Sequence, residues 1–427
     1  MNYSVATLPN GLRVITTPMP TMYSVSALVF LGVGSRFEDD AVAGSSHLLE
    51  HMLFKGTARR PTAQILSETI ESTGGSLDAS TGKEETILSA RVAGADADLA
   101  LDLLADMLLN SLFAAPEVDK EKGVIVEELS MIADSPAEWV HTLLDGIIWP
   151  GHPLGRDIGG TRESVLGLTR ADLVRFRDSH YTPATTVISV AGNLNVQATL
   201  ATVERLFSSW APRAAPQALA APPIAAAPRI HVEERDTEQL NLCVSTGGVD
   251  HHDPDRFAFD LLGSILGGGV SSRLFLELRE RRGLVYDIHT SGQRLSDTGA
   301  LVTYAGVDPR NVQVLVREVV GQLDRLRQEP VGHDELARFK SSYKGHILLG
   351  LEDTYSVASW CGGQQLLRRS IQSPEEVIAA VERVQVADLQ RVARDLFTDE
   401  SLRLAAIGPL DDADAAALEE ELRLAPL

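Results

Sequence analysis

A proline- and alanine-rich segment in the middle of the chain constrains the fold more than any other feature. Residues 211–228 (APRAAPQALAAPPIAAAP) contain five prolines and a single charged side chain, Arg213. This composition favours an extended linker, because proline lacks the amide hydrogen that helices and central strands need. The segment divides the 427 residues into two stretches of nearly equal length. Since a chain this long exceeds one typical core, we expect two structural halves, residues 1–210 and 229–427.

Both stretches show the same order of expected elements. In the first stretch, the patterns predict strands at 14–17, 24–31, 76–80 and 85–92, and helices at 44–54, 62–73, 95–111 and 117–133. In the second stretch, they predict strands at 240–247, 284–292 and 299–306, and helices at 254–266, 272–281, 310–328 and 333–350. Few residues are identical between the two stretches, so the shared order of elements is the only evidence for a duplication. Short strands joined by turns and by helices predict an α+β fold, with helices packed on mainly antiparallel sheets.

Composition excludes several classes of partner. The net charge of −21 argues against binding to nucleic acids or anionic membranes, which require basic surfaces. No apolar run is long enough to span a bilayer, and the N-terminus lacks a basic region followed by an apolar run. Cys243 and Cys361 lie far apart and match no disulfide framework or metal spacing. We therefore expect a cytoplasmic protein, and the predominance of arginine over lysine suggests a GC-rich, bacterial genome.

The run His47-Leu48-Leu49-Glu50-His51 is the most specific chemical motif in the sequence. Residues three and four positions apart share one face of a helix, so both imidazoles and the carboxylate would project together. Two histidines one turn apart can share a zinc ion, and a carboxylate between them can act as a general base. Chance would give roughly 0.04 matches to this pattern in a chain of this composition. The alternative is a solvated helix face with two unrelated histidines.

A catalytic zinc needs a third protein ligand, and the stretch 117–132 (EVDKEKGVIVEELSMI) offers candidates. On a helix, Glu121 and Glu128 flank an apolar stripe, whereas Glu127 points in nearly the opposite direction. A carboxylate at the edge of an apolar core needs a cation nearby, and a zinc ion would supply one. The alternative is a partly exposed glutamate at a helix edge.

Several separated motifs resemble those of the M16 peptidases, the pitrilysin and mitochondrial processing peptidase family. The resemblance covers about residues 5 to 415 and includes motifs in both stretches: HLLEHMLFKGT at 47–57, GGSLDAST at 74–81, PLGR at 153–156, SRLF at 272–275 and LRERRGLVY at 278–286. Motifs in this order over both stretches make a coincidence implausible.

The resemblance implies a role for each matching residue of the first stretch. His47 and His51 match the two zinc histidines, and Glu50 matches the general base. The family's third ligand follows the second histidine by 77 positions, which is Glu128 here. An acid seven residues earlier, Glu121, matches a residue that supports the site behind the ligands. One zinc ion per chain is the expected cofactor.

The resemblance also implies residues that bind the substrate. Arg279 and Tyr286 match a pair from the family's second domain that binds substrate and transition state. Read without the resemblance, Arg279 is part of a basic, solvated helix end, and Tyr286 is an aromatic residue of a strand. An extended peptide would add a strand to a sheet edge near Ala79 and Ser80. One departure is Asp78, which stands where the family usually has asparagine, so the substrate contact there is open.

The patterns predict two homologous α+β halves, and the resemblance implies that they form a clam-shell that encloses a chamber. The expected activity is endopeptidase cleavage of peptides or unfolded segments that enter the chamber. Because one chain carries both sets of motifs, we expect a homodimer, although a heteromer with a related chain stays open. Two alternatives remain: a protease that processes specific precursors, and a non-catalytic interaction subunit like the M16-related core proteins of respiratory complexes.

Overall fold

The computed structural model describes residues 1–223 and 229–426, which form two compact units. Unit 1 and unit 2 are each assembled from three separate stretches of chain. Unit 1 comprises Met1–Leu129, Asp157–Leu219 and Ile347–Pro374, and unit 2 comprises Ser130–Arg156, Ala220–His346 and Glu375–Leu427. In the expected linker, residues 211–223 form no helix or strand, and residues 224–228 lie outside the described residues.

Unit 1 is built on a sheet that has six strands among the described residues, in the order β1-β2-β6-β3-β5-β4. Its strands are β1 Ser4–Thr7, β2 Arg13–Pro18, β3 Ser24–Leu31, β4 Ser76–Thr81, β5 Thr86–Ala93 and β6 Thr186–Gly192. Only the β2–β6 pair is parallel in this sheet as described, and the other four pairs are antiparallel. Strand β4 is therefore at an edge of the sheet, with one side of its backbone unpaired within the sheet.

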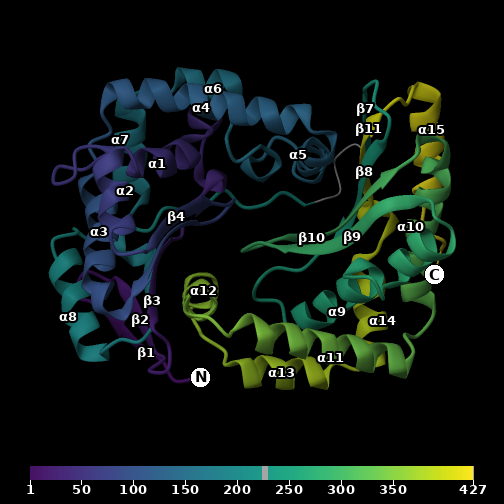
Figure 1. Cartoon of the computed structure of the whole chain (residues 1–427). Helices are drawn as coiled ribbons and strands as arrows, with labels where there is room; N and C mark the ends of the chain where they lie inside the picture. The colour runs from purple at the N-terminus through teal and green to yellow at the C-terminus, as the bar shows by residue number, and fades with distance from the viewer. Residues whose placement is uncertain (224–228, 427) are drawn as a thin grey trace. The chain divides into compact units, whose positions relative to one another are not determined.

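Helices cover both faces of this sheet. They are α1 Ser45–Leu53, α2 Ala63–Glu71, α3 Ala97–Asn110, α6 Arg162–Gly167, α7 Arg170–His180, α8 Val196–Phe207 and α12 Thr354–Leu367. Alternation along β3 assigns its residues to two cores, because successive side chains point to opposite faces. Val25, Val29 and their neighbours pack with α1, α3 and α8, whereas Leu28 and Phe30 pack against α12 on the other face (Figure 1).

Unit 2 repeats this architecture. Its strands are β7 Ile230–Glu234, β8 Leu240–Gly247, β9 Val285–Arg294, β10 Gly299–Val307 and β11 Arg403–Gly408, in the order β7-β11-β8-β10-β9. Only the β7–β11 pair is parallel in this sheet as described. Order and directions match β2-β6-β3-β5-β4 of unit 1 strand for strand, which supports the predicted duplication. The edge strand β9 is thus the equivalent of β4.

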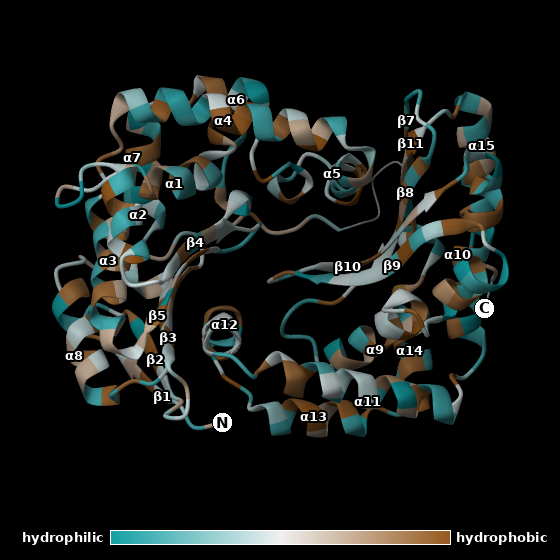
Figure 2. Ribbon diagram, in the orientation of Figure 1, coloured by the Kyte–Doolittle hydropathy of each residue, from teal (hydrophilic) through white to brown (hydrophobic). Residues whose placement is uncertain are grey.

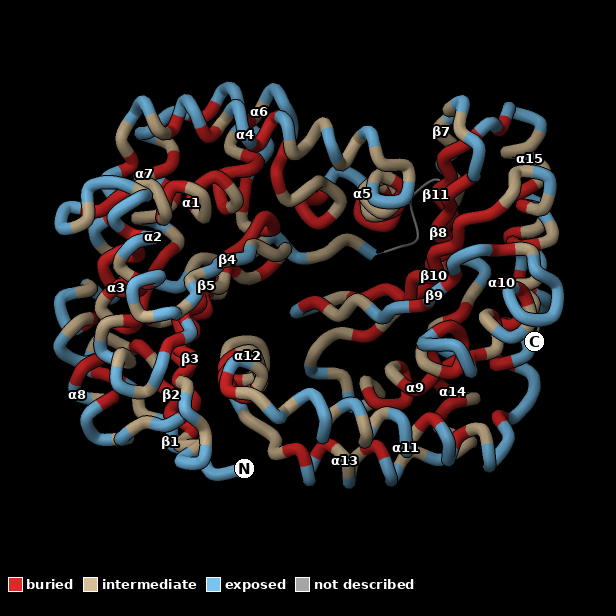
Figure 3. The backbone as a smooth tube through the Cα atoms, viewed as in Figure 1, coloured by how far each residue is buried: buried red, intermediate tan, exposed pale blue. Residues whose placement is uncertain are grey.

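Helices also cover the sheet of unit 2. They are α5 Pro136–Ile148, α9 Arg256–Gly267, α10 Val312–Gln328, α13 Pro374–Arg383, α14 Val386–Leu396 and α15 Asp412–Glu421, with a π-helix, η7, at Phe275–Arg281. Two longer helices, α4 Ala115–Asp134 and α11 His333–Gly350, each begin in one unit and end in the other. Figure 2 shows hydrophilic and hydrophobic residues mixed along α4 and α11, and Figure 3 shows buried residues concentrated on the strands.

The compact units do not coincide with the two stretches on either side of the linker. Helix α5 precedes the linker but packs on β8 and β11 of unit 2, where Val140 and Leu144 join the core. Helix α12 follows the linker but packs on β3 and β6 of unit 1 through Val357 and Ala358. The two halves of the sequence therefore exchange equivalent helices, because each sheet receives its covering helix from the other half.

The predicted fold class is confirmed: both units are α+β, with mainly antiparallel sheets and packed helices. The predicted strand at 24–31 and helix at 333–350 match β3 and α11. The helix predicted at 272–281 is a π-helix over 275–281. None of the helices in the described part of the chain combines the length and apolarity that a membrane span requires.

Candidate metal centre

Helix α1 carries His47, Glu50 and His51, and a buried carboxylate holds its first turn. Glu38 accepts hydrogen bonds from the backbone nitrogens of Gly44 and Ser46 at 2.7 and 2.6 Å. These amide hydrogens have no partner inside the helix, and a negative charge at this end also interacts favourably with the helix dipole. Gly44 has a φ of +90°, and a Cβ at this position would lie 2.4 Å from the carbonyl oxygen of Gly159. The start of α1 is thus fixed in place.

Helix α4 supplies the acidic side chains opposite α1. Val118 and Ile125 are buried on its inner face, as the apolar stripe predicts. Glu121 is buried and Glu128 is half-buried, whereas Glu127 is exposed. The spacing of seven residues places Glu121 and Glu128 two turns apart on the same face.

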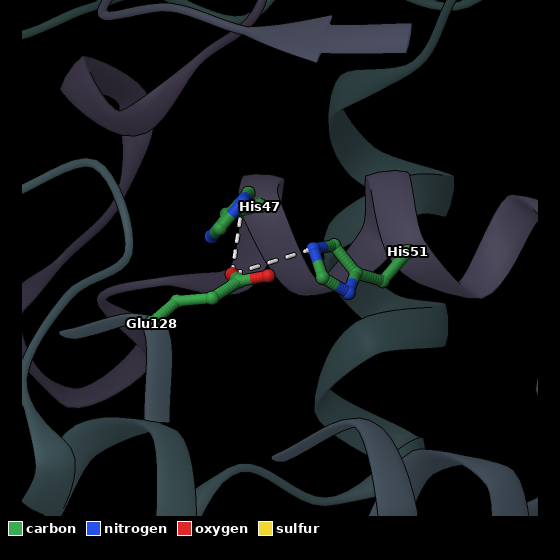
Figure 4. A group of neighbouring side chains, drawn as sticks. All are labelled: His47, His51 and Glu128. Atoms are coloured by element: carbon green, nitrogen blue, oxygen red, sulfur yellow. Dashed lines mark ion pairs between the residues drawn. The ribbon is translucent and has the colours of Figure 1, made fainter. Parts of the chain in front are cut away.

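His47, His51 and Glu128 come together as one cluster. Oε2 of Glu128 lies 3.8 Å from Nε2 of His47 and 3.7 Å from Nε2 of His51. The ligand atoms of the three residues all lie within 4.8 Å of one another. The carboxylate of Glu128 lies between the two imidazole rings (Figure 4). No other group of three or more such residues with this geometry is present in residues 1–223 and 229–426.

The environment of His47 favours its neutral form. Burial, and then the neighbouring ring of His51, lower the pKa of His47 to about 4. Neutral imidazole is the form that binds a metal ion, so this histidine does not have to lose a proton at neutral pH. The two rings meet edge to face, with centroids 4.8 Å apart.

Glu121 lies behind His51 and orients its ring. Oε2 of Glu121 is 3.1 Å from Nδ1 of His51, and Oε1 is 2.7 Å from Nζ of Lys55. Burial alone would raise the pKa of Glu121, but the hydrogen bonds from Lys55 and His51 outweigh it, and its pKa is lowered. An acceptor at Nδ1 leaves Nε2 of His51 with its lone pair toward Glu128.

Glu50 lies on α1 between the two histidines and bonds to the edge strand β4. The hydroxyl of Thr81 donates a hydrogen bond of 2.5 Å to Oε2 of Glu50. Burial raises the pKa of Glu50, and this effect outweighs the opposing hydrogen bond from Thr81. A carboxylate whose pKa is raised toward neutrality is a better proton acceptor and donor at physiological pH.

The expected substrate-binding residues Ala79 and Ser80 lie on β4. Ala79 is half-buried, and Ser80 is exposed at the edge of the sheet. The carboxylate of Asp78 accepts a hydrogen bond of 2.9 Å from the backbone nitrogen of Ala79. Asp78, which departs from the family pattern, thus engages its own strand.

Arg279 and Tyr286 belong to unit 2 and contact each other. The Arg279 guanidinium carbon lies 5.5 Å from the centre of the Tyr286 ring and 4.9 Å from that of Phe275. Arg279 projects from the π-helix η7, a type of turn that often marks functional positions. Tyr286 is on the edge strand β9 and is 78% exposed, which is unusual for a large aromatic ring.

Two residues at this cluster were not predicted from the sequence: Lys55 and Thr81. Lys55 follows His51 by four residues, so the helical spacing that paired the histidines could have identified it. Thr81 follows Ala79 by two residues, so the strand alternation places both on one side of β4. Their partners, Glu121 and Glu50, depend on how distant segments pack.

Two family models match the chain in succession. The model described as Insulinase (Peptidase family M16) matches residues 13–162, and the model described as Peptidase M16 inactive domain matches residues 167–343.

Similar proteins extend over nearly the whole chain. An uncharacterized zinc protease of Streptomyces coelicolor is 35% identical over 420 residues, which is 97% of this chain and 91% of that protein. The uncharacterized zinc protease YmxG of Bacillus subtilis is 35% identical over 407 residues, 94% and 97% of the respective chains. Among solved structures, a protease from Helicobacter pylori is similar with a TM-score of 0.90 at 24% identity, over 96% of this chain and 99% of that chain. A chain of complex III from Candida albicans has a TM-score of 0.85 at 21% identity, over 99% and 100%; these two likenesses concern the fold.

Proposed function

This chain belongs to the M16 peptidase family, and from that premise we propose that it is a zinc-dependent endopeptidase of the inverted His-x-x-Glu-His type. The observation that carries the proposal is the carboxylate of Glu128 between the imidazoles of His47 and His51. Glu50 lies in the same turn of α1 and supplies the acid–base group that such chemistry needs.

The three side chains fit a zinc ion. Tetrahedral zinc with bonds of about 2.0–2.2 Å needs nitrogen and oxygen ligands about 3.3–3.6 Å apart. The distances of 3.7 and 3.8 Å from Glu128 to the two histidines are wider, and all three ligand atoms lie within 4.8 Å of one another, so side-chain movements would close the site. Two imidazoles and one carboxylate leave one position for water or substrate, as in catalytic sites. We propose one zinc ion per chain.

Bound zinc would act as a Lewis acid that polarises the scissile carbonyl and makes the attacking water more acidic. Glu50 would take the proton from this water and then donate it to the leaving amine. Thr81 holds Oε2 of Glu50, so we assign the proton transfer to Oε1. The chain thereby contributes a base that is fixed in position before the substrate arrives.

The edge strand β4 is the proposed dock for the peptide. A peptide in extended form would pair with the backbone of Ala79 and Ser80, and the unpaired side of β4 supports this mode. Because the peptide would bind through its backbone groups, the enzyme would accept substrates with many different sequences. Arg279 and Tyr286 are proposed to bind substrate and transition state, and Tyr286, an exposed residue with a hydroxyl group, suits a donor to a developing oxyanion.

The proposed substrates are peptides or unfolded segments that enter a chamber. The net charge of −21 makes nucleic acid an unsuitable partner. A homodimer and a cytoplasmic location in a bacterium are further parts of the proposal, and bacterial relatives support the source.

Two other functions remain open to the same test. A processing protease would cleave a narrow set of precursors with the same residues. A non-catalytic subunit would share the fold, and this chain is similar in fold to a chain of complex III. The presence of His47, Glu50, His51 and Glu128 together favours catalysis over this second function, because a subunit without activity has no need of the set.

Cleavage of a peptide library by the full chain tests the proposal. We expect internal bonds to be cut, cleavage to stop after metal is removed with a chelator, and activity to return when zinc is added. Cleavage confined to one narrow sequence class would favour the processing protease. Bound zinc without any cleavage would contradict the proposal and favour a non-catalytic role.

A further inference from the structure

Lys55 lies one helical turn beyond His51, just after α1 ends at Leu53. Its backbone nitrogen donates to the carbonyl of Met52 at 3.2 Å, so a tight turn of three residues keeps Lys55 close to the end of the helix. The side chain is 21% exposed and directs Nζ to Oε1 of Glu121 at 2.7 Å. A lysine held this closely has given up much of its rotamer freedom, which costs free energy unless the contact compensates for it.

Glu121 uses both of its oxygens in this arrangement. Its side chain is 3% exposed, Oε1 faces Lys55, and Oε2 faces Nδ1 of His51 at 3.1 Å. A buried carboxylate is tolerated where hydrogen bonds and an opposite charge compensate for the lost water. The bond to Lys55 also fixes the rotation of the carboxylate, and this rotation determines where Oε2 points.

The two histidines of the cluster are held differently. Nδ1 of His51 has the oxygen of Glu121 as its partner. Nδ1 of His47 is buried and has no hydrogen-bond partner within the described residues. Of the two histidines, His51 is therefore the one whose ring is oriented by a hydrogen bond at Nδ1. This orientation depends on the carboxylate of Glu121, which Lys55 holds.

We infer that Lys55 is a positioning residue for the zinc ligand His51 and that it acts through Glu121. Lys55 holds Oε1, Glu121 accepts the Nδ1 hydrogen of His51 through Oε2, and the ring presents Nε2 to the metal. The inference rests on the proposed zinc site. The inference extends that site to Lys55, a residue that would contact neither metal nor substrate. The ion pair between Lys55 and Glu121 would then be part of the metal site, in addition to linking the end of α1 to α4.

Zinc affinity, measured by competition with a chelating dye, tests this relay. In Lys55→Met we expect the zinc dissociation constant to rise roughly tenfold to a hundredfold, as for other residues behind a metal ligand. Lys55→Arg keeps a charged donor and should retain most of the affinity. Lys120→Met is the matched control, because Lys120 is on α4, is 66% exposed and lies 3.8 Å from Glu117. Its affinity should equal that of the wild type.

A double-mutant cycle separates the relay from a general effect of charge. If Lys55 acts through Glu121, adding Lys55→Met to Glu121→Gln should weaken zinc binding little beyond Glu121→Gln alone. Additive losses would overturn the relay, as would a Lys55→Met protein with the affinity of the wild type. If Lys55→Met does not fold, Lys55→Leu also removes both the charge and the donor and is subject to the same criteria.

The metal-free protein gives a second readout that does not depend on zinc. With ¹⁵N-labelled histidine, we expect the ring of His51 to be in the Nδ1–H form in the wild type and in a mixture of tautomers in Lys55→Met. Unchanged ring signals in Lys55→Met would overturn the inference. A wild-type protein that binds no zinc would instead contradict the proposed function, and the tautomer comparison would still decide the role of Lys55.

Discussion

The hydroxyl of Thr81 donates a hydrogen bond of 2.5 Å to Oε2 of Glu50, although the two residues lie 31 positions apart. Thr81 is the last residue of β4, the strand that also carries Ala79 and Ser80. The strand proposed to dock the peptide therefore also holds the proposed general base. One side chain, that of Thr81, thus links the proposed peptide pairing along β4 to the proposed proton transfer at Glu50.

Replacing Thr81 should lower turnover more than substrate binding. Thr81→Val keeps the shape and removes the donor, so Glu50 loses its fixed orientation, and we expect kcat to fall about tenfold with a smaller change in KM. Thr81→Ser should restore most of the rate. Thr69→Val is a suitable control, since the Thr69 hydroxyl donates to Ile65 within α2. Equal steady-state kinetics for wild type and Thr81→Val would show that this bond has no catalytic role.

Variants of the adjacent residues Glu127 and Glu128 test the proposal that Glu128 is the third zinc ligand. Glu128→Gln should lose most of its zinc, because a neutral amide is a weaker ligand than a carboxylate. Glu127→Gln changes the same charge at an exposed position and should keep its zinc. Metal content per chain, measured by atomic emission after dialysis, checks this ranking. The reverse ranking would mean that the wrong glutamate has been assigned.

Tyr286→Phe tests whether the hydroxyl of Tyr286 has the proposed role in catalysis. The change keeps the ring beside Arg279 and removes only the hydroxyl. If this hydroxyl donates to the developing oxyanion, kcat should fall by about tenfold to a thousandfold while zinc content stays constant. Tyr23→Phe is the control, because Tyr23 is also a highly exposed tyrosine, with 93% of its surface accessible. Steady-state kinetics equal to the wild type would exclude a role for the Tyr286 hydroxyl.

Asp106 anchors the segment that follows α1, and its ionisation has a testable effect on stability. The side chain is fully buried and accepts hydrogen bonds from Thr57, Arg59, Arg60 and Asn110. Burial would raise the pKa of Asp106, but these bonds outweigh it and lower the pKa below the ordinary value of 3.8. The folded state therefore gains stability from this carboxylate above the unfolded pKa and loses it as the pH falls through the lower folded pKa.

Asp106→Asn should destabilise the protein by about 1–3 kcal/mol at pH 7. The difference from the wild type should shrink as the pH is lowered below 3.8, because the wild-type carboxylate is then becoming protonated as well. Denaturant unfolding at pH 7 and at acidic pH checks both parts. A deficit that stays constant or grows in acid would contradict the assigned direction of the pKa shift.

Local sequence patterns were sufficient to predict the helices and strands whose periodicity or boundaries are clear. Strand β3 is an apolar run that ends before a glycine, and α11 has buried apolar residues at helical spacing, Leu336 and Phe339. Strands β6 and β11 were not predicted, although they are buried at every residue just as the predicted strands β8 and β10 are. A strand that is covered on both faces has no alternation of polar and apolar residues, so its sequence resembles any short buried segment.

The exchange of α5 and α12 between the two halves of the sequence could not be predicted. Both helices bury apolar residues against a sheet, but the local sequence does not say which sheet, because this depends on the path of the whole chain. At the candidate site, the spacing of three and four residues was enough to place His47 and His51 on one face of α1. Sequence spacing could not predict the contacts Lys55–Glu121 and Thr81–Glu50, because they join segments that tertiary packing brings together.

The most direct test of the account is the turnover of Glu50→Gln at a measured zinc content. Glutamine keeps the size of the side chain and the bond from Thr81 but cannot accept the proton from water. We predict that this variant contains as much zinc as the wild type and still binds peptide, while its cleavage rate falls roughly a hundredfold or more. Near wild-type cleavage by Glu50→Gln with zinc bound would contradict the proposed mechanism.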